Sequence, residues 1–113
     1  MNQKYVPALR LRSKSDFARL RRGKKYVSGQ LLIVHGKNNL NHACLGLAVS
    51  RKYGNAVQRN RLKRRMREVY RCHPLRHLSV DILIIPRTGW QSMKDPIKDA
   101  ELGMNKLMQW YQA

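Results

Sequence analysis

The chain has 113 residues and a formal net charge of +18, from 24 Lys and Arg against six Asp and Glu. This length is typical of one domain with a modest core, and a hydrophobic share of 42% excludes a disordered basic tail. The charge suits a polyanion, with nucleic acid the first candidate and an anionic membrane the second. No apolar run could span a bilayer or form a signal-peptide core, so we expect a cytoplasmic protein.

The positive charge is concentrated in two segments. Residues 10–25 contain eight Lys or Arg and Asp16, and residues 51–76 contain ten and Glu68. They carry +7 and +9, which makes 16 of the 18 net charges. Residues 94–106 hold three Lys against three acids and are electrically neutral. The two basic segments predict two RNA contacts, or one continuous surface if the fold brings them together.

The local patterns predict a regular series of elements. In chain order these are a helix over 14–22, a further short strand near 26–27, strands over 31–34 and 43–50, a helix over about 56–71, a strand over 80–86, and a final helix opened by Asp95 and Pro96.

These elements predict one α+β domain over residues 1–113, a small sandwich of three helices on a mostly antiparallel or mixed sheet. The strand over 43–50 is expected to run antiparallel to the strand over 31–34. The run VDILIIP at 80–86 is almost continuously apolar, which is typical of a strand buried on both faces.

Both long helices carry an apolar stripe. In the basic helix, Leu62, Met66, Val69 and Tyr70 fall within about a third of the circumference at roughly 100° per residue. The cations occupy the rest, so one narrow face can pack while a broad cationic face stays in water. The final helix has a predicted core face that consists of Ile97, Ala100, Met104, Leu107, Met108 and Tyr111.

The strand over 43–50 has one bulky and one small face. Leu45, Leu47 and Val49 alternate with the small residues Cys44, Gly46, Ala48 and Ser50. The small face could hold the first helix directly, or it could border a cleft for single-stranded nucleic acid. Phe17 on that helix could be a core anchor or a platform for a base.

Two other kinds of site receive little support. A zinc site would draw four ligands from His42, Cys44, Cys72, His73 and His77, whose spacing fits no standard pattern of ligands. Catalysis by His would need acids to orient the rings, and the chain has few. We therefore predict neither a metal site nor a catalytic residue in the protein.

The string GNAVQRNRLKRRMRE at 54–68 resembles the RNR signature of the bacterial ribonuclease P protein component. The segments SKSDFARLRRGKK and VDILIIPRTG match the same family mainly by spacing and character. The resemblance implies a small α/β fold in which the RNR helix joins two parallel strands by a rare left-handed crossover.

The same resemblance implies the function. Such a protein binds a catalytic RNA and the single-stranded 5′ leader of precursor tRNA, and it helps the RNA remove the leader. The RNA carries the catalysis and mainly holds the required Mg²⁺, with no organic cofactor. The implied partners are the ribonuclease P catalytic RNA and precursor tRNA, without a membrane or a protein partner.

The resemblance also assigns site residues. The RNR motif maps onto Arg59, Asn60 and Arg61. The surface for the catalytic RNA is expected to comprise Arg51, Lys52, Asn55, Arg59, Asn60, Arg61, Lys63, Arg64, Arg65 and Arg67. The leader cleft is expected to comprise Arg12, Phe17, Arg21, Val34, Gly46, Ala48 and Ser50.

The chain departs from some relatives in its aromatic residues. It has Leu20-Arg21 and Ile33-Val34 where relatives often carry further aromatics. A leader groove here would depend more on cations and apolar packing than on stacking.

The alternative function is another basic nucleic-acid binder, such as a ribosomal protein or a helix-turn-helix protein. The latter needs two helices three or four residues apart, whereas strand-like segments flank the basic helix.

Overall fold

The computed structural model describes Leu20 and residues 22–112. In chain order the elements are the strands β1 (Lys24–Ser28), β2 (Leu31–Lys37) and β3 (Cys44–Leu47), the helix α2 (Ala56–Cys72), the short 3₁₀ helix η2 (Pro74–His77), the strand β4 (Val80–Pro86) and the helix α3 (Pro96–Gln112).

The predicted elements are confirmed wherever the structure describes them. The described residues contain two α-helices rather than three, because the helix predicted over 14–22 lies almost wholly outside them. The strand predicted over 43–50 is shorter than expected and ends at Leu47. No helix in this part of the chain is both long and apolar enough to cross a membrane.

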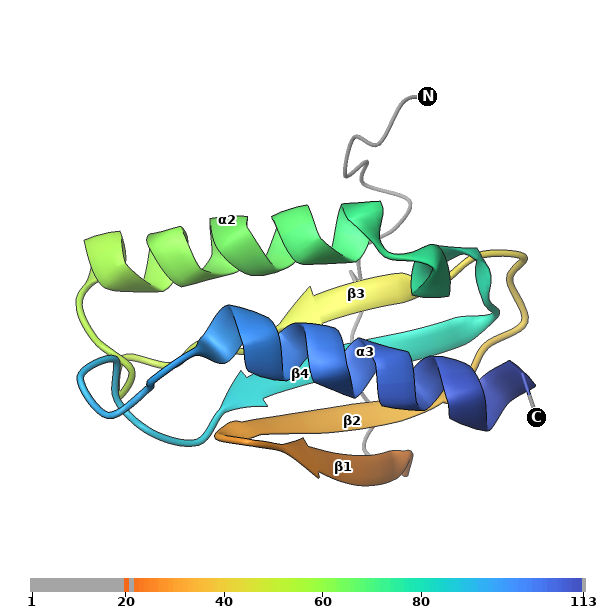
Figure 1. Ribbon diagram of the computed structural model, residues 1–113, viewed down its shortest axis with the longest axis horizontal. Coiled ribbons are helices and arrows are strands. Elements are labelled where there is room, and N and C mark those ends of the chain that lie inside the picture. Colours follow the sequence, from red (N-terminus) through yellow and green to blue (C-terminus); the bar gives the residue numbers. More distant parts are fainter. Residues whose placement is uncertain (1–19, 21, 113) are drawn as a thin grey trace.

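The four strands form one mixed sheet in the order β1-β2-β4-β3. β2 pairs antiparallel with β1 and β4, and β3 pairs parallel with β4. The expected antiparallel directions of β2 and β3 are therefore correct, but the two strands are not neighbours, because β4 lies between them. In Figure 1, α2 passes in front of the sheet as the chain goes from β3 to β4, which makes the crossover left-handed.

Both α-helices lie on one face of the sheet, here called the front face (Figure 1). Residues that alternate along the strands, such as Ile33, Leu45 and Ile82, are at most 1% exposed and form the main core with the helices. From α2 this core takes the predicted stripe, with Leu62, Met66 and Tyr70 buried and Val69 partly buried. From α3 it takes every residue of the predicted face, since Ala100, Met104 and Leu107 are buried and Ile97, Met108 and Tyr111 pack against them.

The opposite face, here called the back face, carries a smaller apolar cluster. Leu20, Val34 and Cys44 are buried there, and Leu32, Leu83 and Ile85 pack against them while partly exposed. On the front face of β4, Val80, Ile82 and Ile84 are fully buried, whereas Leu83 and Ile85 on its back face are partly exposed. The prediction that both faces of this strand are buried holds more strongly for the front.

Two glycines let α3 and the β1–β2 turn approach each other closely. A Cβ at Gly103 would lie 2.4 Å from Ile33 Cδ1, so a side chain at this position would force the Ile33 side chain to shift. Gly29 has a φ of +58° and faces the Asp99 carboxylate. The Gln30 N–H donates to Asp99 Oδ2 at 3.3 Å, and the Ser28 hydroxyl donates to the Asp99 carbonyl at 2.6 Å.

Candidate nucleic-acid interface

The basic helix begins at a capping box. The Gln58 N–H donates to Asn55 Oδ1 at 2.9 Å, and the Asn55 N–H donates to Gln58 Oε1 at 2.8 Å. These two bonds satisfy backbone donors that an uncapped helix leaves unpaired. Asn55, predicted as an RNA-binding residue, therefore has a structural role at the start of α2.

The segment before α2 is held by the loop that precedes α3. Tyr53 is 8% exposed and belongs to the main core, and its carbonyl accepts the Trp90 N–H at 2.7 Å. Burial raises the pKa of the Tyr53 hydroxyl, and the nearby charge of Arg65 partly offsets this rise. With Tyr53 anchored, the exposed side chains of Arg51 and Lys52 stand directly before the cationic helix.

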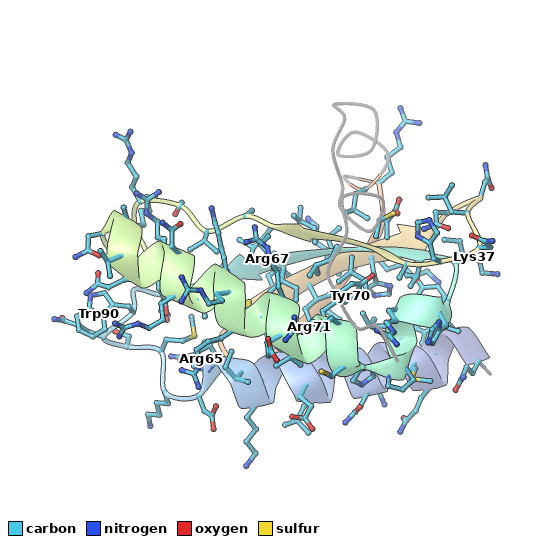
Figure 2. The ribbon with its side chains drawn as sticks, turned by 90° about the horizontal axis from the view of Figure 1, so that it is seen from above. Lys37, Arg65, Arg67, Tyr70, Arg71 and Trp90 are labelled. Atoms are coloured by element: carbon cyan, nitrogen blue, oxygen red, sulfur yellow. The ribbon has the colours of Figure 1, made fainter. Side chains whose placement is uncertain are left out.

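The predicted RNR residues cover the sides of α2 that do not pack on the sheet. Asn60, Arg61, Arg64 and Arg65 are exposed, and Arg59, Lys63 and Arg67 are partly buried. In Figure 2, Arg65 projects on the side nearer α3 and Arg67 on the side nearer β3. We call these seven residues, with Arg51 and Lys52, the basic helix surface.

Acidic side chains are scarce beside this surface. The one acid in α2 is Glu68, which forms an ion pair with Arg71 at 2.6 Å. The seven residues of α2 that belong to the basic helix surface include six cations and no acid. Such a surface can approach several phosphates without repulsion from carboxylates.

A pocket of about 410 Å³ lies at the first turns of α2. Its cationic lining residues are Arg61, Arg65 and Lys94, and its wall includes Trp90, which is 44% exposed. Trp90 and Lys94 were not among the predicted site residues. An aromatic residue next to the turn after β4 was the one available signal, and sequence alone does not place that turn beside α2.

The predicted leader-cleft residues only partly come together. Val34 and Gly46 both face Leu83 across neighbouring strands of the back face, so they form one row. Ala48 and Ser50 follow β3 and are exposed, which leaves that end of the small face open. Cys44, at the other end, is buried against Leu20 and Val34. The remaining members of the predicted cleft, Arg12, Phe17 and Arg21, lie outside the described residues.

The residues weighed for zinc have separate roles. His42 Nδ1 lies 3.9 Å from Cys44 Sγ, whereas Cys72 is exposed at the end of α2. His73 accepts the Leu75 N–H on Nδ1 at 3.0 Å and bonds Asn105 Oδ1 through Nε2 at 2.6 Å. In the part of the chain that the structure covers, no three His, Cys, Asp or Glu side chains form a candidate metal site.

The geometry agrees with the proteins that this chain resembles. The sequence model of the family Ribonuclease P matches residues 7–110. The ribonuclease P protein component of Staphylococcus epidermidis is 39% identical over an alignment of 88 residues, with coverage of 76% of each chain. The RNase P protein of Staphylococcus aureus has a solved structure with 30% identity, a TM-score of 0.76, and coverage of 91% of this chain and 97% of that one.

A second solved structure, from another organism, is also similar to this chain. The RNase P protein of Thermotoga maritima is 29% identical, with a TM-score of 0.65 and coverage of 90% of this chain and 94% of that one. The family match spans nearly the whole chain, and the fold and the RNR helix agree with it. The chain therefore belongs to the ribonuclease P protein component family.

Proposed function

We propose that this chain is the RNA-binding subunit of ribonuclease P and promotes removal of the 5′ leader from precursor tRNA. The main support is the basic helix surface, in which the RNR residues Arg59, Asn60 and Arg61 lie on a capped helix whose other side is fixed in the core. An RNA backbone binds such a surface through several phosphates at once. The catalytic RNA is its ligand.

The back face is the proposed contact for the single-stranded leader. Val34 and Gly46 form a row there, and Ala48 and Ser50 continue the strand direction with exposed side chains. Leu32, Leu83 and Ile85 add apolar surface that remains partly exposed. Because these residues are aliphatic, they bind the leader by packing rather than by stacking.

The chemistry of cleavage belongs to the RNA in this proposal. The described residues do not provide a set of His, Cys, Asp or Glu side chains that could hold a metal ion. Following the resemblance to the family, we assign the Mg²⁺ ions to the phosphates of the RNA. The protein contributes binding and orientation.

The direct test is to purify the protein with its bound RNA and to sequence that RNA. One dominant catalytic RNA, with precursor tRNA as a minor species, is the expected result. Ribosomal RNA as the dominant species would replace the proposal with the alternative of a ribosomal protein. A variant with Arg59→Gln, Arg61→Gln and Arg65→Gln should recover much less RNA at the same yield of folded protein.

The leader contact is tested by filling the open end of the back face. Ala48→Leu adds bulk at an exposed position without changing charge, and Ser79→Leu does the same before β4, at the opposite end of the strands. We expect Ala48→Leu, but not Ser79→Leu, to reduce the preference of the assembled enzyme for precursor tRNA over leaderless tRNA. Retained preference in the folded Ala48→Leu enzyme would place the leader elsewhere.

Gly46→Val separates a cleft from a packed core. Gly46 is buried, so a valine there either obstructs a groove or overpacks the interior. A normal melting temperature with lost leader preference supports the groove. A melting temperature lowered by several degrees, with leader preference retained, shows that the position is core.

A further inference from the structure

A second pocket lies far from the basic helix surface. Its volume is about 420 Å³, within the range of ligand-binding pockets. It is lined by Arg22, Gly23, Lys24, His35, Gly36, Lys37, Trp110 and Tyr111. The pocket beside α2 includes Pro96, the first residue of α3, whereas this one includes Trp110 near the end of the same helix. At 1.5 Å per helical residue, the two lie about 20 Å apart along α3.

The lining combines positive charge with an accessible aromatic ring. Arg22, Lys24 and Lys37 are exposed, and no carboxylate belongs to the lining. Trp110 is 44% exposed, and Lys24 Nζ lies 4.7 Å from its ring centroid. Cations beside an accessible indole ring are the groups that bind the phosphate and the base of an unpaired nucleotide.

The wall of this pocket contains a buried histidine, and only one of its two ring nitrogens has a hydrogen-bond partner among the described residues. His35 is 0% exposed, and its Nδ1 lies 2.6 Å from the Tyr111 hydroxyl. Its Nε2 is buried and has no hydrogen-bond partner among the described residues. The ring makes edge contacts with Trp110 and Tyr111, with centroids 5.2 Å and 5.5 Å away. These contacts fix both aromatic side chains beside the cations.

The protonation state of His35 is consistent with a pocket whose positive charge comes from other residues. Burial, and to a smaller extent the charge of Lys24, lower the pKa of its imidazole. The ring is therefore neutral at pH 7, and the positive charge of the pocket comes from its Lys and Arg side chains.

Close backbone packing holds the cations in place. A Cβ at Gly23 would lie 2.5 Å from the His35 carbonyl oxygen, so only glycine allows this approach to β2. The Gly23 N–H also donates to the Leu20 carbonyl at 2.8 Å. Since Arg22 and Lys24 flank Gly23, their backbone positions at the pocket are determined by the sheet.

We propose that this pocket is a further RNA site that binds one unpaired nucleotide, with the base on Trp110 and the phosphate among Arg22, Lys24 and Lys37. The inference extends the proposed function and shares with it only the premise that the partner is RNA. In the free protein the Lys24 ammonium lies over the indole ring. On binding, Lys24 moves from the ring to the phosphate, and the base takes the ring face.

The two tryptophans of the chain allow each site to be observed separately. With Trp90→Phe, Trp110 is the single tryptophan, and with Trp110→Phe, Trp90 is the single tryptophan and reports on the pocket beside α2. We would titrate both proteins with pentaadenylate at low salt. Base stacking should quench the fluorescence of Trp110 in a saturable manner.

Substitutions then show which side chains make the site. In the protein whose single tryptophan is Trp110, the pair Lys24→Gln and Lys37→Gln should weaken binding severalfold. Lys98→Gln, which removes one exposed charge from the other end of α3, should leave pentaadenylate binding unchanged.

The indole ring is tested by replacing Trp110 with Leu in the Trp90→Phe background. This change should reduce pentaadenylate affinity by about fivefold to a hundredfold, measured by filter binding, as expected for loss of one stacked base. Melting curves verify that each variant is folded.

The outcomes separate this inference from the proposed function. No quenching of Trp110, or equal weakening by Lys98→Gln, overturns the nucleotide site. Saturation by adenosine monophosphate with the same affinity as pentaadenylate overturns the assignment to RNA in favour of a free nucleotide. Arg61→Gln should weaken the Trp90 response and spare the Trp110 response. If Arg61→Gln weakens neither the Trp90 response nor the Trp110 response, and Trp110 is still quenched, the nucleotide site stands. The proposed RNA binding by the basic helix surface is then contradicted.

Discussion

α2 and α3 are a natural comparison within one molecule. Each has 17 residues, lies on the front face and buries an apolar stripe in the same core. α2 carries seven Lys or Arg and one acid, a net +6, whereas α3 carries two Lys and two acids, a net zero. The buried stripe therefore determines where a helix lies, and the charges on its outward side determine what it can bind.

The largest expected difference between the helices is the effect of salt on their contribution to RNA binding. If the basic segments neutralise about six phosphates, raising salt from about 50 to 200 mM should weaken binding about a thousandfold. Replacing Arg59, Arg61 and Arg65 with Gln should reduce the slope of log affinity against log salt. Replacing Lys98 and Lys106 of α3 with Gln should change it much less. Affinity that does not vary with salt would contradict backbone contacts by either basic segment.

The second prediction separates the two sides of α2. Leu62→Ala or Met66→Ala should lower the free energy of unfolding by about 2–5 kcal/mol, because each removes a fully buried side chain. Arg61→Ala, at an exposed position, should change it by less than about 0.5 kcal/mol while weakening RNA binding. Urea unfolding of all three variants provides the measurement. Equal destabilisation would mean that α2 is rotated about its axis.

The third prediction compares the starts of the two helices. Asn55 caps α2, and Asp95 Oδ1 caps α3 by accepting the Lys98 N–H at 3.0 Å. Asn55→Ala and Asp95→Ala should each cost about 0.5–2 kcal/mol. Asn55→Ser should keep the cap without adding charge and retain stability. If Asn55→Ser still weakens RNA binding, Asn55 contacts RNA in addition to capping the helix, because stability and charge are both controlled for.

The smallest predicted effect concerns pH and the end of α3. Since the folded state lowers the pKa of His35, the unfolded chain binds a proton at this residue more readily. The stability contributed by neutral His35 is present above pH 6.5, and it is lost as the pH falls below that value toward the lower pKa of the folded state. His35→Gln should therefore flatten the dependence of unfolding free energy on pH between about 7.5 and 5. An unchanged slope would mean that folding does not lower the pKa of His35.

Sequence patterns predicted most elements because their residues repeat with helical or strand period. The stripe of α2, the apolar run of β4 and the Asp95-Pro96 start of α3 each determine their own element locally. The pairing of strands is not local. Nothing in the residues of β3 shows that β4 will lie between it and β2, and the crossover hand came from resemblance to a family.

The candidate sites also differ in whether a local sequence pattern could predict them. The basic helix surface was predictable because its cations lie close together in the sequence, within α2 or just before it. The nucleotide pocket was not, because it joins Lys24, His35 and Trp110 from three elements, and α3 carries no net charge. The closeness of these residues depends on Gly23 and on the docking of α3, which no periodic pattern encodes.

The central place of β4 has a consequence for how the protein is made. β1 and β2 can pair as soon as residue 37 has left the ribosome, but β3 has no neighbour until residue 86 follows. The basic helix is thus synthesised before the sheet that will support it. The halves of the chain on either side of α2 cannot each form a stable sheet alone, so the domain folds as one unit late in translation. A chain that ends within α2, or between α2 and β4, leaves β3 with both edges unpaired.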